Sequence, residues 1–225
     1  RNHDPQAALR RDLARFPQMK KSFLFATLAL VAPAVGAADR PNIVLILTDD
    51  LGWGDLACYG HPTIRTPNLD QMAREGVRFT QFYAAAPACS PSRAALLTGR
   101  LPVRSGMNQV LNPWSQGGLP ESETTIAAAL KPAGYATAAV GKWHLGHLPQ
   151  YSPVKRGFDS YFGIPYSNDM SKAKAGNPGF IKALDQHPEV GGTPLMRNET
   201  QIETEPDQSQ ITSRYTDEAT RFIRE

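Results

Sequence analysis

The sequence predicts an α/β fold, because strand-like and helix-like segments alternate along it. Residues 43–48 form an unbroken apolar, β-branched run, which is typical of a strand buried on both faces of a parallel sheet. A helix is expected at 66–75, where Thr-Pro opens the segment and a glycine follows it. Residues 135–140 return to a strand pattern.

The remaining elements follow in chain order. Residues 77–83 alternate like a strand, and 91–97 should form a helix that begins at or just after Cys89, with Pro91 in its first turn. A short helix is expected at 124–131, before Pro132 and Gly134. The Gly- and Pro-rich stretch 146–210 is expected to form long loops with few regular elements. A last amphipathic helix carries apolar side chains at Tyr215, Ala219, Phe222 and Ile223.

Composition indicates a globular protein and gives no sign of nucleic-acid binding. The chain has 225 residues, of which 41% are hydrophobic and 20% charged, enough for one large domain or two small ones. Residues 1–37 hold six of the 24 Lys and Arg but only two of the 21 Asp and Glu. The rest of the chain therefore has a net charge of −1, with no basic patch.

The N-terminal region has the pattern of a secretory signal peptide at 19–37. Met-Lys-Lys at 19–21 is a basic start, 22–35 is apolar, and small residues follow as a cleavage site. The apolar part is short for a membrane span, so no stable membrane anchor is expected. The alternative is an apolar helix of the folded domain. We expect 1–18 to be non-native upstream sequence, and 38–225 to be a periplasmic or secreted domain.

Two adjacent carboxylates, Asp49 and Asp50, follow the first predicted strand. Open α/β sheets bind ligands beyond the carboxyl ends of their strands, and hard cations such as Ca²⁺ and Mg²⁺ prefer oxygen ligands. The pair is therefore a candidate metal site. The alternative is a solvated turn.

Cys89 and Arg93 lie four residues apart, which places them on one face of the predicted helix. A cysteine at a helix N-terminus can be a thiol nucleophile, and the guanidinium can offset nearby negative charge. The alternatives are a structural cysteine in a Pro-led helix and a disulfide with Cys58. We expect Cys58 to be a lone, partly buried thiol.

Lys142, His144 and Ser167 complete the candidate site. Lys142 and His144 follow the strand 135–140 and, at positions i and i+2 of an extended segment, could converge on one anion. Lysine suits sulfate, and histidine can carry a proton near neutral pH. The Lys-Trp-His run could instead line a loop, and Ser167 could be a turn residue.

From Pro41 to about Asp169 the sequence resembles the type I sulfatases, which depend on formylglycine, in the branch of arylsulfatase A and N-acetylgalactosamine-6-sulfatase. The resemblance implies an alkaline-phosphatase-like α/β domain with a mostly parallel central sheet flanked by helices, truncated at its C-terminal side. The matching segments are 41–43, 49–50, 52–55, 66–70, Cys89-Ser90-Pro91-Ser92-Arg93, 101–102, 141–146 and 163–167.

The resemblance also implies a role for each candidate residue. In this family the cysteine at the position of Cys89 is oxidised by a maturation enzyme to formylglycine, whose hydrate is the nucleophile. Asp49, Asp50 and the modified Cys89 would hold a divalent cation, usually calcium, with magnesium possible. Arg93 would brace the hydrate, Lys142 would contact it and the sulfate, and His144 would take its proton. Ser167 matches a position in the sulfate pocket.

Two departures from the family are expected to matter. Asn168 stands where the branch usually has histidine. The further metal ligands and the leaving-group acid are expected beyond residue 225, so 38–225 alone should be inactive. The expected activity is hydrolysis of aryl or glycan sulfate esters. The alternatives are a phosphate or phosphonate monoester hydrolase of the same superfamily and a non-catalytic binder of sulfated glycans.

Overall fold

The computed structural model describes residues 40–171, 173 and 175–225. The chain divides into two compact units, Arg1–Thr48 and Asp49–Glu225, and all regular elements given below lie in the second. The predicted signal peptide at 19–37 and the segment 1–18 fall outside the described residues. Among those residues, no helix is both long and apolar enough to cross a membrane.

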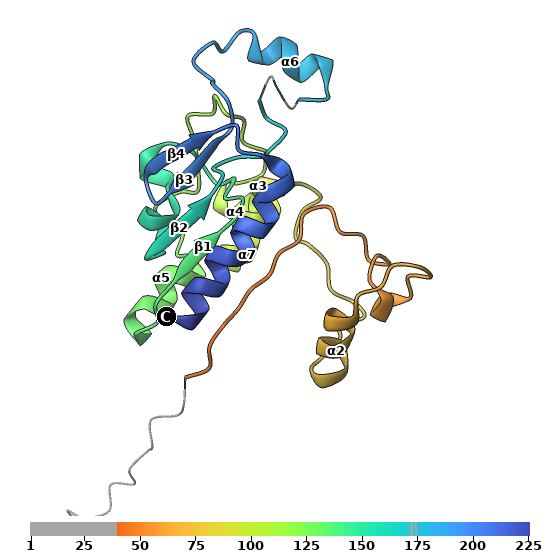
Figure 1. Cartoon of the computed structure of the whole chain (residues 1–225). Helices are drawn as coiled ribbons and strands as arrows, with labels where there is room; N and C mark the ends of the chain where they lie inside the picture. Colours follow the sequence, from red (N-terminus) through yellow and green to blue (C-terminus); the bar gives the residue numbers. More distant parts are fainter. Residues whose placement is uncertain (1–39, 172, 174) are drawn as a thin grey trace, which may run out of the picture. The chain divides into compact units, whose positions relative to one another are not determined.

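Helices and short strands alternate along the second unit, as Figure 1 shows. The α-helices are α2 (Pro67–Glu75), α3 (Cys89–Thr98), α4 (Pro102–Ser105), α5 (Ile126–Leu130), α6 (Pro178–Leu184) and α7 (Gln208–Arg224). The strands are β1 (Ala138–Val140), β2 (Ser160–Gly163), β3 (Pro194–Arg197) and β4 (Thr200–Thr204). Short 3₁₀ turns are η2 (Ala57–Tyr59), η3 (Lys131–Ala133), η4 (Pro149–Tyr151) and η5 (Pro153–Arg156).

The four strands form one mixed sheet in the order β1-β2-β3-β4. β1 and β2 are parallel, with Ala139 opposite Tyr161. β2 and β3 are antiparallel, and so are β3 and β4, which form a hairpin with an irregular register between Leu195 and Met196. The α/β class is confirmed, and the described sheet combines one parallel pairing with two antiparallel ones.

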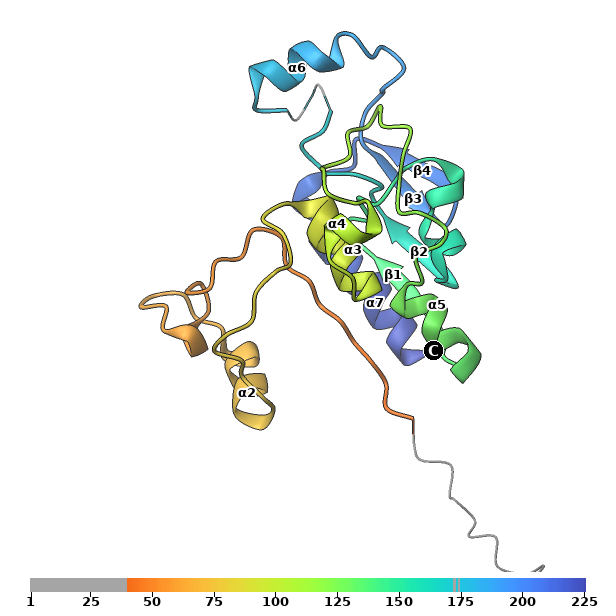
Figure 2. The same ribbon diagram turned by 180° about the vertical axis from the view of Figure 1, so that it is seen from behind.

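Helices cover both faces of this sheet. Successive residues of a strand point to opposite faces, so neighbouring residues of β2 pack against different helices. Tyr161 of β2 belongs to a buried cluster with Ala94 of α3. The next residue, Phe162, belongs to a second cluster, against which Tyr215 of α7 packs. Figure 1 accordingly shows α7 in front of the sheet, and Figure 2, seen from behind, shows α3 on the near side.

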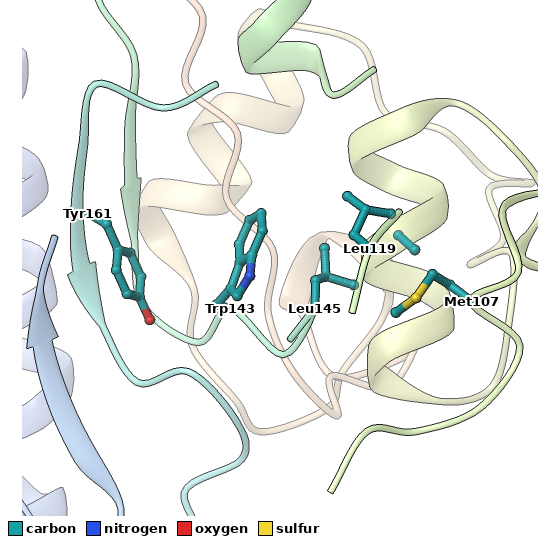
Figure 3. Packing of buried hydrophobic residues seen from close by; sticks show 6 residues of the cluster. Met107, Leu119, Trp143, Leu145 and Tyr161 are labelled. Carbon is teal, nitrogen blue, oxygen red and sulfur yellow. The ribbon is translucent and has the colours of Figure 1, made fainter. Parts of the chain in front are cut away.

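The cluster on the α3 side holds the segment that follows β1. Figure 3 shows Tyr161, Trp143, Leu145, Leu119 and Met107 in a row, with Trp143 and Leu145 at its centre. Trp143 is 4% exposed and Leu145 is fully buried. Burial of side chains of this size contributes about 1.5–3 kcal/mol each, so the chain is anchored on either side of residue 144.

The strand predicted at 43–48 is wrong: this segment has no regular secondary structure. Its apolar side chains, from Ile43 to Leu47, are 49–73% exposed. A β-strand is stabilised by ladder hydrogen bonds to a neighbour, and the described residues give this segment no ladder. β-Branched residues alone do not make a strand, since their preference expresses packing on a sheet.

Two further expectations are also wrong. Residues 77–83 do not form a strand, and Val77, Phe79, Phe82 and Tyr83 are 59–79% exposed. The stretch 146–210 contains three strands and α6, so it is more regular than its Gly and Pro content indicates. Its strands are only four or five residues long, too short for a clear alternating pattern.

The helix predictions are confirmed. α2 begins at Pro67 and ends before Gly76, and α3 begins at Cys89 with Pro91 in its first turn. α5 is shorter than predicted, because a 3₁₀ turn replaces its last residues at Lys131–Ala133. α7 buries part of its apolar stripe, although Ile223 remains 60% exposed.

Candidate active site

Helix α3 places Cys89 and Arg93 one turn apart. Ala88 precedes the helix in an extended conformation, and Gly99 ends it in the left-handed conformation, with φ of 66°. Cys89 is half-buried and its thiol is free, as is that of Cys58. The expectation of a lone, partly buried Cys58 is therefore confirmed.

The turn after β1 carries Lys142 and His144 and is fixed by backbone hydrogen bonds to β2 and to the chain that follows β2. Gly141 N donates to Phe162 O at 2.8 Å, and His144 N donates to Pro165 O at 3.0 Å. His144 has a positive φ of 57°. The left-handed residue means that the segment is not uniformly extended, so the prediction that i and i+2 point the same way does not describe this turn.

Asp49, Arg93, Lys142 and Ser167 form one polar network. Lys142 Nζ lies 2.7 Å from Asp49 Oδ2 and donates to Ser167 Oγ at 3.1 Å. Arg93 lies 3.4 Å from the same Asp49 oxygen and donates to Lys142 O at 2.6 Å. Both cationic side chains are nearly buried, at 13% and 14% exposed, and they face a single carboxylate. The network therefore holds more positive than negative charge, which favours an anionic ligand.

The charges of this network determine the ionisation of Asp49. Partial burial alone would raise the pKa of Asp49, but the hydrogen bond and charge of Lys142, together with Arg93, hold the pKa below its ordinary value. The carboxylate is thus ionised at neutral pH and neutralises part of the positive charge of its two partners.

His144 is 1% exposed and neutral at neutral pH. Desolvation, together with the charges of Lys142 and Arg93, lowers the pKa of His144 to about 4, although the hydrogen bond to Leu111 and the Asp49 charge oppose this shift. Its Nε2 lies 2.7 Å from Leu111 O, and its buried Nδ1 has no partner among the described residues.

Asp50 and the Cys89 side chain are not joined to this network by any hydrogen bond or ion pair in the part of the chain described. Asp50 is exposed, with φ of 56°. The two carboxylates have the oxygen donors that a hard divalent cation prefers. The described residues contain no cluster of three or more His, Cys, Asp or Glu that could hold a metal ion.

Asn168, where the branch was expected to have histidine, connects the Ser167 loop to α7. Its Nδ2 donates to Gln208 Oε1 at 2.9 Å, and Gln208 Nε2 donates back to Asn168 O at the same distance. This reciprocal pair of hydrogen bonds joins the loop after Ser167 to the N-terminus of α7.

Sequence reasoning missed two contributors to the site, Ser90 and Leu111. Ser90 Oγ accepts from Leu111 N at 3.2 Å, and Leu111 O contacts His144. No pattern in the sequence indicates them. Leu111 takes part only through its backbone N–H and C=O groups, and Ser90 lies in a motif whose recognised chemistry belongs to Cys89 and Arg93.

The geometry defines an α/β protein whose nearly buried Lys142 and Arg93 lie beside the carboxyl ends of its parallel strands. A family model described as Sulfatase matches residues 41–225, and the chain therefore belongs to the sulfatase family.

The chain is similar to curated members of this family over part of their length. It is 59% identical over 143 residues to arylsulfatase G of Rattus norvegicus, covering 64% of this chain and 27% of the relative. It is 57% identical over 146 residues to arylsulfatase A of Homo sapiens, covering 64% and 29%. N-acetylgalactosamine-6-sulfatase of Homo sapiens is 55% identical over 140 residues, covering 59% and 27%. The matched region is thus less than a third of each of these relatives.

Solved structures support the same fold. The crystal structure of Ps i-CgsB matches with a TM-score of 0.67 and 37% identity, covering 81% of this chain and 41% of that chain. The PsFucS1 sulfatase from Pseudoalteromonas sp. matches with a TM-score of 0.64 and 33% identity, covering 79% and 39%. A third structure, BT4656 in complex with its substrate D-glucosamine-2-N,6-O-disulfate, has a TM-score of 0.58 and 30% identity, covering 82% and 31%.

Proposed function

We propose that the protein hydrolyses sulfate monoesters, consuming one water and releasing sulfate and an alcohol or phenol. The observation that carries this proposal is the convergence of Lys142 and Arg93 on Asp49, with Ser167 beside Lys142. Two nearly buried cations against one carboxylate can accommodate an additional anion. Membership of the sulfatase family supports sulfate as that anion.

Each residue of the network has a role in this proposal. Lys142 and Ser167 bind the sulfate oxygens, since an ammonium and a hydroxyl can both donate to them. Arg93, held by Lys142 O and Asp49, braces the group at position 89. His144 is neutral and therefore able to accept a proton during turnover.

Cys89 is proposed to be converted to formylglycine by a maturation enzyme, and Asp49 and Asp50 to hold part of a calcium or magnesium site together with position 89. The donor types of the two aspartates fit such a cation. The modified residue would supply a hydrated aldehyde as the attacking oxygen, and the cation would polarise the sulfate oxygens.

The substrate class we propose is a sulfated glycan or an aryl sulfate, met in the periplasm or outside the cell. The names of the curated relatives and the sulfated sugar bound to BT4656 support this choice. We further propose that 19–37 is a removable signal peptide and 38–225 the N-terminal part of the catalytic domain, inactive alone. N-terminal sequencing of the mature protein tests the cleavage after residue 37.

The test uses the complete protein, co-expressed with a formylglycine-generating enzyme. Peptide mass spectrometry across Cys89 should show loss of sulfur, and the converted protein should hydrolyse p-nitrophenyl sulfate in preference to the phosphate and the phenylphosphonate esters. Cys89→Ala should abolish turnover. Full activity with position 89 still carrying sulfur would contradict the role of formylglycine, and preference for the phosphorus esters would contradict sulfatase activity.

A further inference from the structure

A chain of two hydrogen bonds joins the first turn of α3 to the buried histidine of the site. Ser90 follows Cys89 and is fully buried, and its Oγ accepts from Leu111 N at 3.2 Å. The same peptide segment presents Leu111 O to His144 Nε2 at 2.7 Å. The Leu111 residue thus links the Ser90 hydroxyl to the His144 ring by one hydrogen bond on each side.

This contact determines which ring nitrogen of His144 carries the proton. A backbone carbonyl has only lone pairs to offer, so at 2.7 Å the Nε2 atom must be the N–H donor. The other nitrogen, Nδ1, is buried without a partner among the described residues. A proton on Nδ1 would leave a buried donor unsatisfied in a ring that already lies near Lys142 and Arg93. Nδ1 therefore keeps its lone pair free.

We propose that Ser90 and the Leu111 peptide are positioning elements that hold His144 in the Nε2–H tautomer, with Nδ1 as the proton acceptor of the reaction. The assignment of the tautomer rests on geometry alone. Its catalytic consequence rests on the proposed function, in which His144 takes a proton.

The arrangement also explains why a hydroxyl lies at a fully buried position of α3. Ser90 is at the start of the helix that carries Cys89, whereas His144 is in the turn after β1. Through Leu111 the two are joined by hydrogen bonds of fixed direction, so the nucleophile position and the proton acceptor keep their orientation together. A catalytic base oriented by a second group in this way is known to depend strongly on that group.

The first test needs no variant. In the complete protein labelled with ¹⁵N-histidine, long-range ¹H–¹⁵N NMR spectra distinguish the two tautomers of a neutral imidazole. We expect His144 to show the Nε2–H pattern at pH 7, assigned by the signals that disappear in His144→Gln. The Leu111 amide should exchange slowly with solvent, because its acceptor is fully buried. An Nδ1–H pattern, or fast exchange of the Leu111 amide, would overturn the proposal even if sulfate esters were hydrolysed.

The second test removes the hydroxyl. In Ser90→Ala we expect a mixture of both tautomers and a loss of kcat of about tenfold or more with little change in KM, normalised to the fraction of Cys89 converted. Ser90→Thr keeps an oxygen acceptor and should restore the single tautomer. Thr98→Ala, which loses a side-chain hydrogen bond to Ala94 O in the same helix, is the matched control and should behave as wild type.

The outcomes separate the two proposals. A single unchanged tautomer in folded Ser90→Ala would refute the positioning role, whereas correct tautomers in a protein that hydrolyses no sulfate ester would refute only the proposed function. If Ser90→Ala does not fold, the tautomer of His144 and the exchange rate of the Leu111 amide in the wild-type protein decide whether the positioning proposal holds.

Discussion

Lys142 Nζ lies 2.7 Å from Asp49 Oδ2, although 93 positions separate the two residues in the sequence. Asp49 is at the N-terminal end of the second unit and Lys142 is in the turn after β1. The ion pair therefore joins the Asp-Asp motif to the turn that carries the buried histidine, and the Lys142 ammonium helps to hold the pKa of Asp49 below its ordinary value.

Removal of the ammonium should raise the pKa of Asp49. In Lys142→Met the hydrogen bond and charge that oppose desolvation are lost, so the carboxyl should titrate at higher pH than in wild type. ¹³C NMR of the labelled carboxyl measures this. Lys182→Met, in α6, is the control, and an Asp49 pKa that is the same in Lys142→Met and wild type would show that the ion pair does not form.

Burial of neutral His144 should make stability depend on pH. Its pKa is lowered from 6.5 to about 4, so between these values the unfolded state binds more protons than the folded state. The contribution, roughly 3 kcal/mol, is complete above about pH 6.5 and is lost as the pH falls toward 4. Denaturant unfolding across this window should be less pH-dependent in His144→Gln than in wild type or His61→Gln. Equal slopes in all three would contradict the assignment.

Gly163 should tolerate no side chain. A Cβ there would lie 1.8 Å from Gly141 O, in the backbone of the turn that leads to Lys142. We expect Gly163→Ala to destabilise the fold by about 3 kcal/mol or more, measured by thermal or urea unfolding. Gly191→Ala, where a Cβ meets nothing within 4 Å, should change stability by about 0.5 kcal/mol or less. Similar stabilities of Gly163→Ala and Gly191→Ala would show that the backbones of Gly163 and Gly141 are not in contact.

Trp114 should fasten the α6 segment to the loop that contains Leu111. Its ring stacks on His187 with centroids 4.6 Å apart and packs on Phe180 at 5.4 Å. Aromatic pairs of this kind contribute about 0.5–1.5 kcal/mol each, so Trp114→Ala should accelerate amide exchange across Pro178–Leu184. Gly117→Ala in the same loop should leave this exchange unchanged. Unaltered protection in Trp114→Ala would mean that other contacts hold α6.

Much of the candidate site could be predicted because its residues follow recognisable local patterns. Pro91 starts a helix, so Cys89 and Arg93 could be placed one turn apart, and Lys142 follows a strand whose end positions it. The joining of Arg93, Lys142, Asp49 and Ser167 is a tertiary result. Asp49 was expected to follow a strand that the structure does not form, and only the family resemblance gave Ser167 a role.

The remaining features depend on partners that a local pattern does not reveal. The segment 43–48 has strand composition but no ladder neighbour among the described residues, and composition cannot supply one. The β3–β4 hairpin was missed although Asn198 marks it: this residue has a positive φ of 55°, as tight hairpin turns require. The role of Leu111 could not be found at all, because its contact is made by a backbone carbonyl that every residue possesses.

The turn that carries the catalytic candidates is attached through main-chain atoms. Gly141, Trp143 and His144 each donate their N–H groups to the segment Phe162–Pro165, and Gly163 allows the two backbones to approach closely. These main-chain hydrogen bonds do not involve the side chains of the outer loops. Replacement of the outer loops could therefore give an enzyme of this architecture a new substrate while Lys142 and His144 stay where they are, which makes the scaffold a favourable starting point for directed evolution.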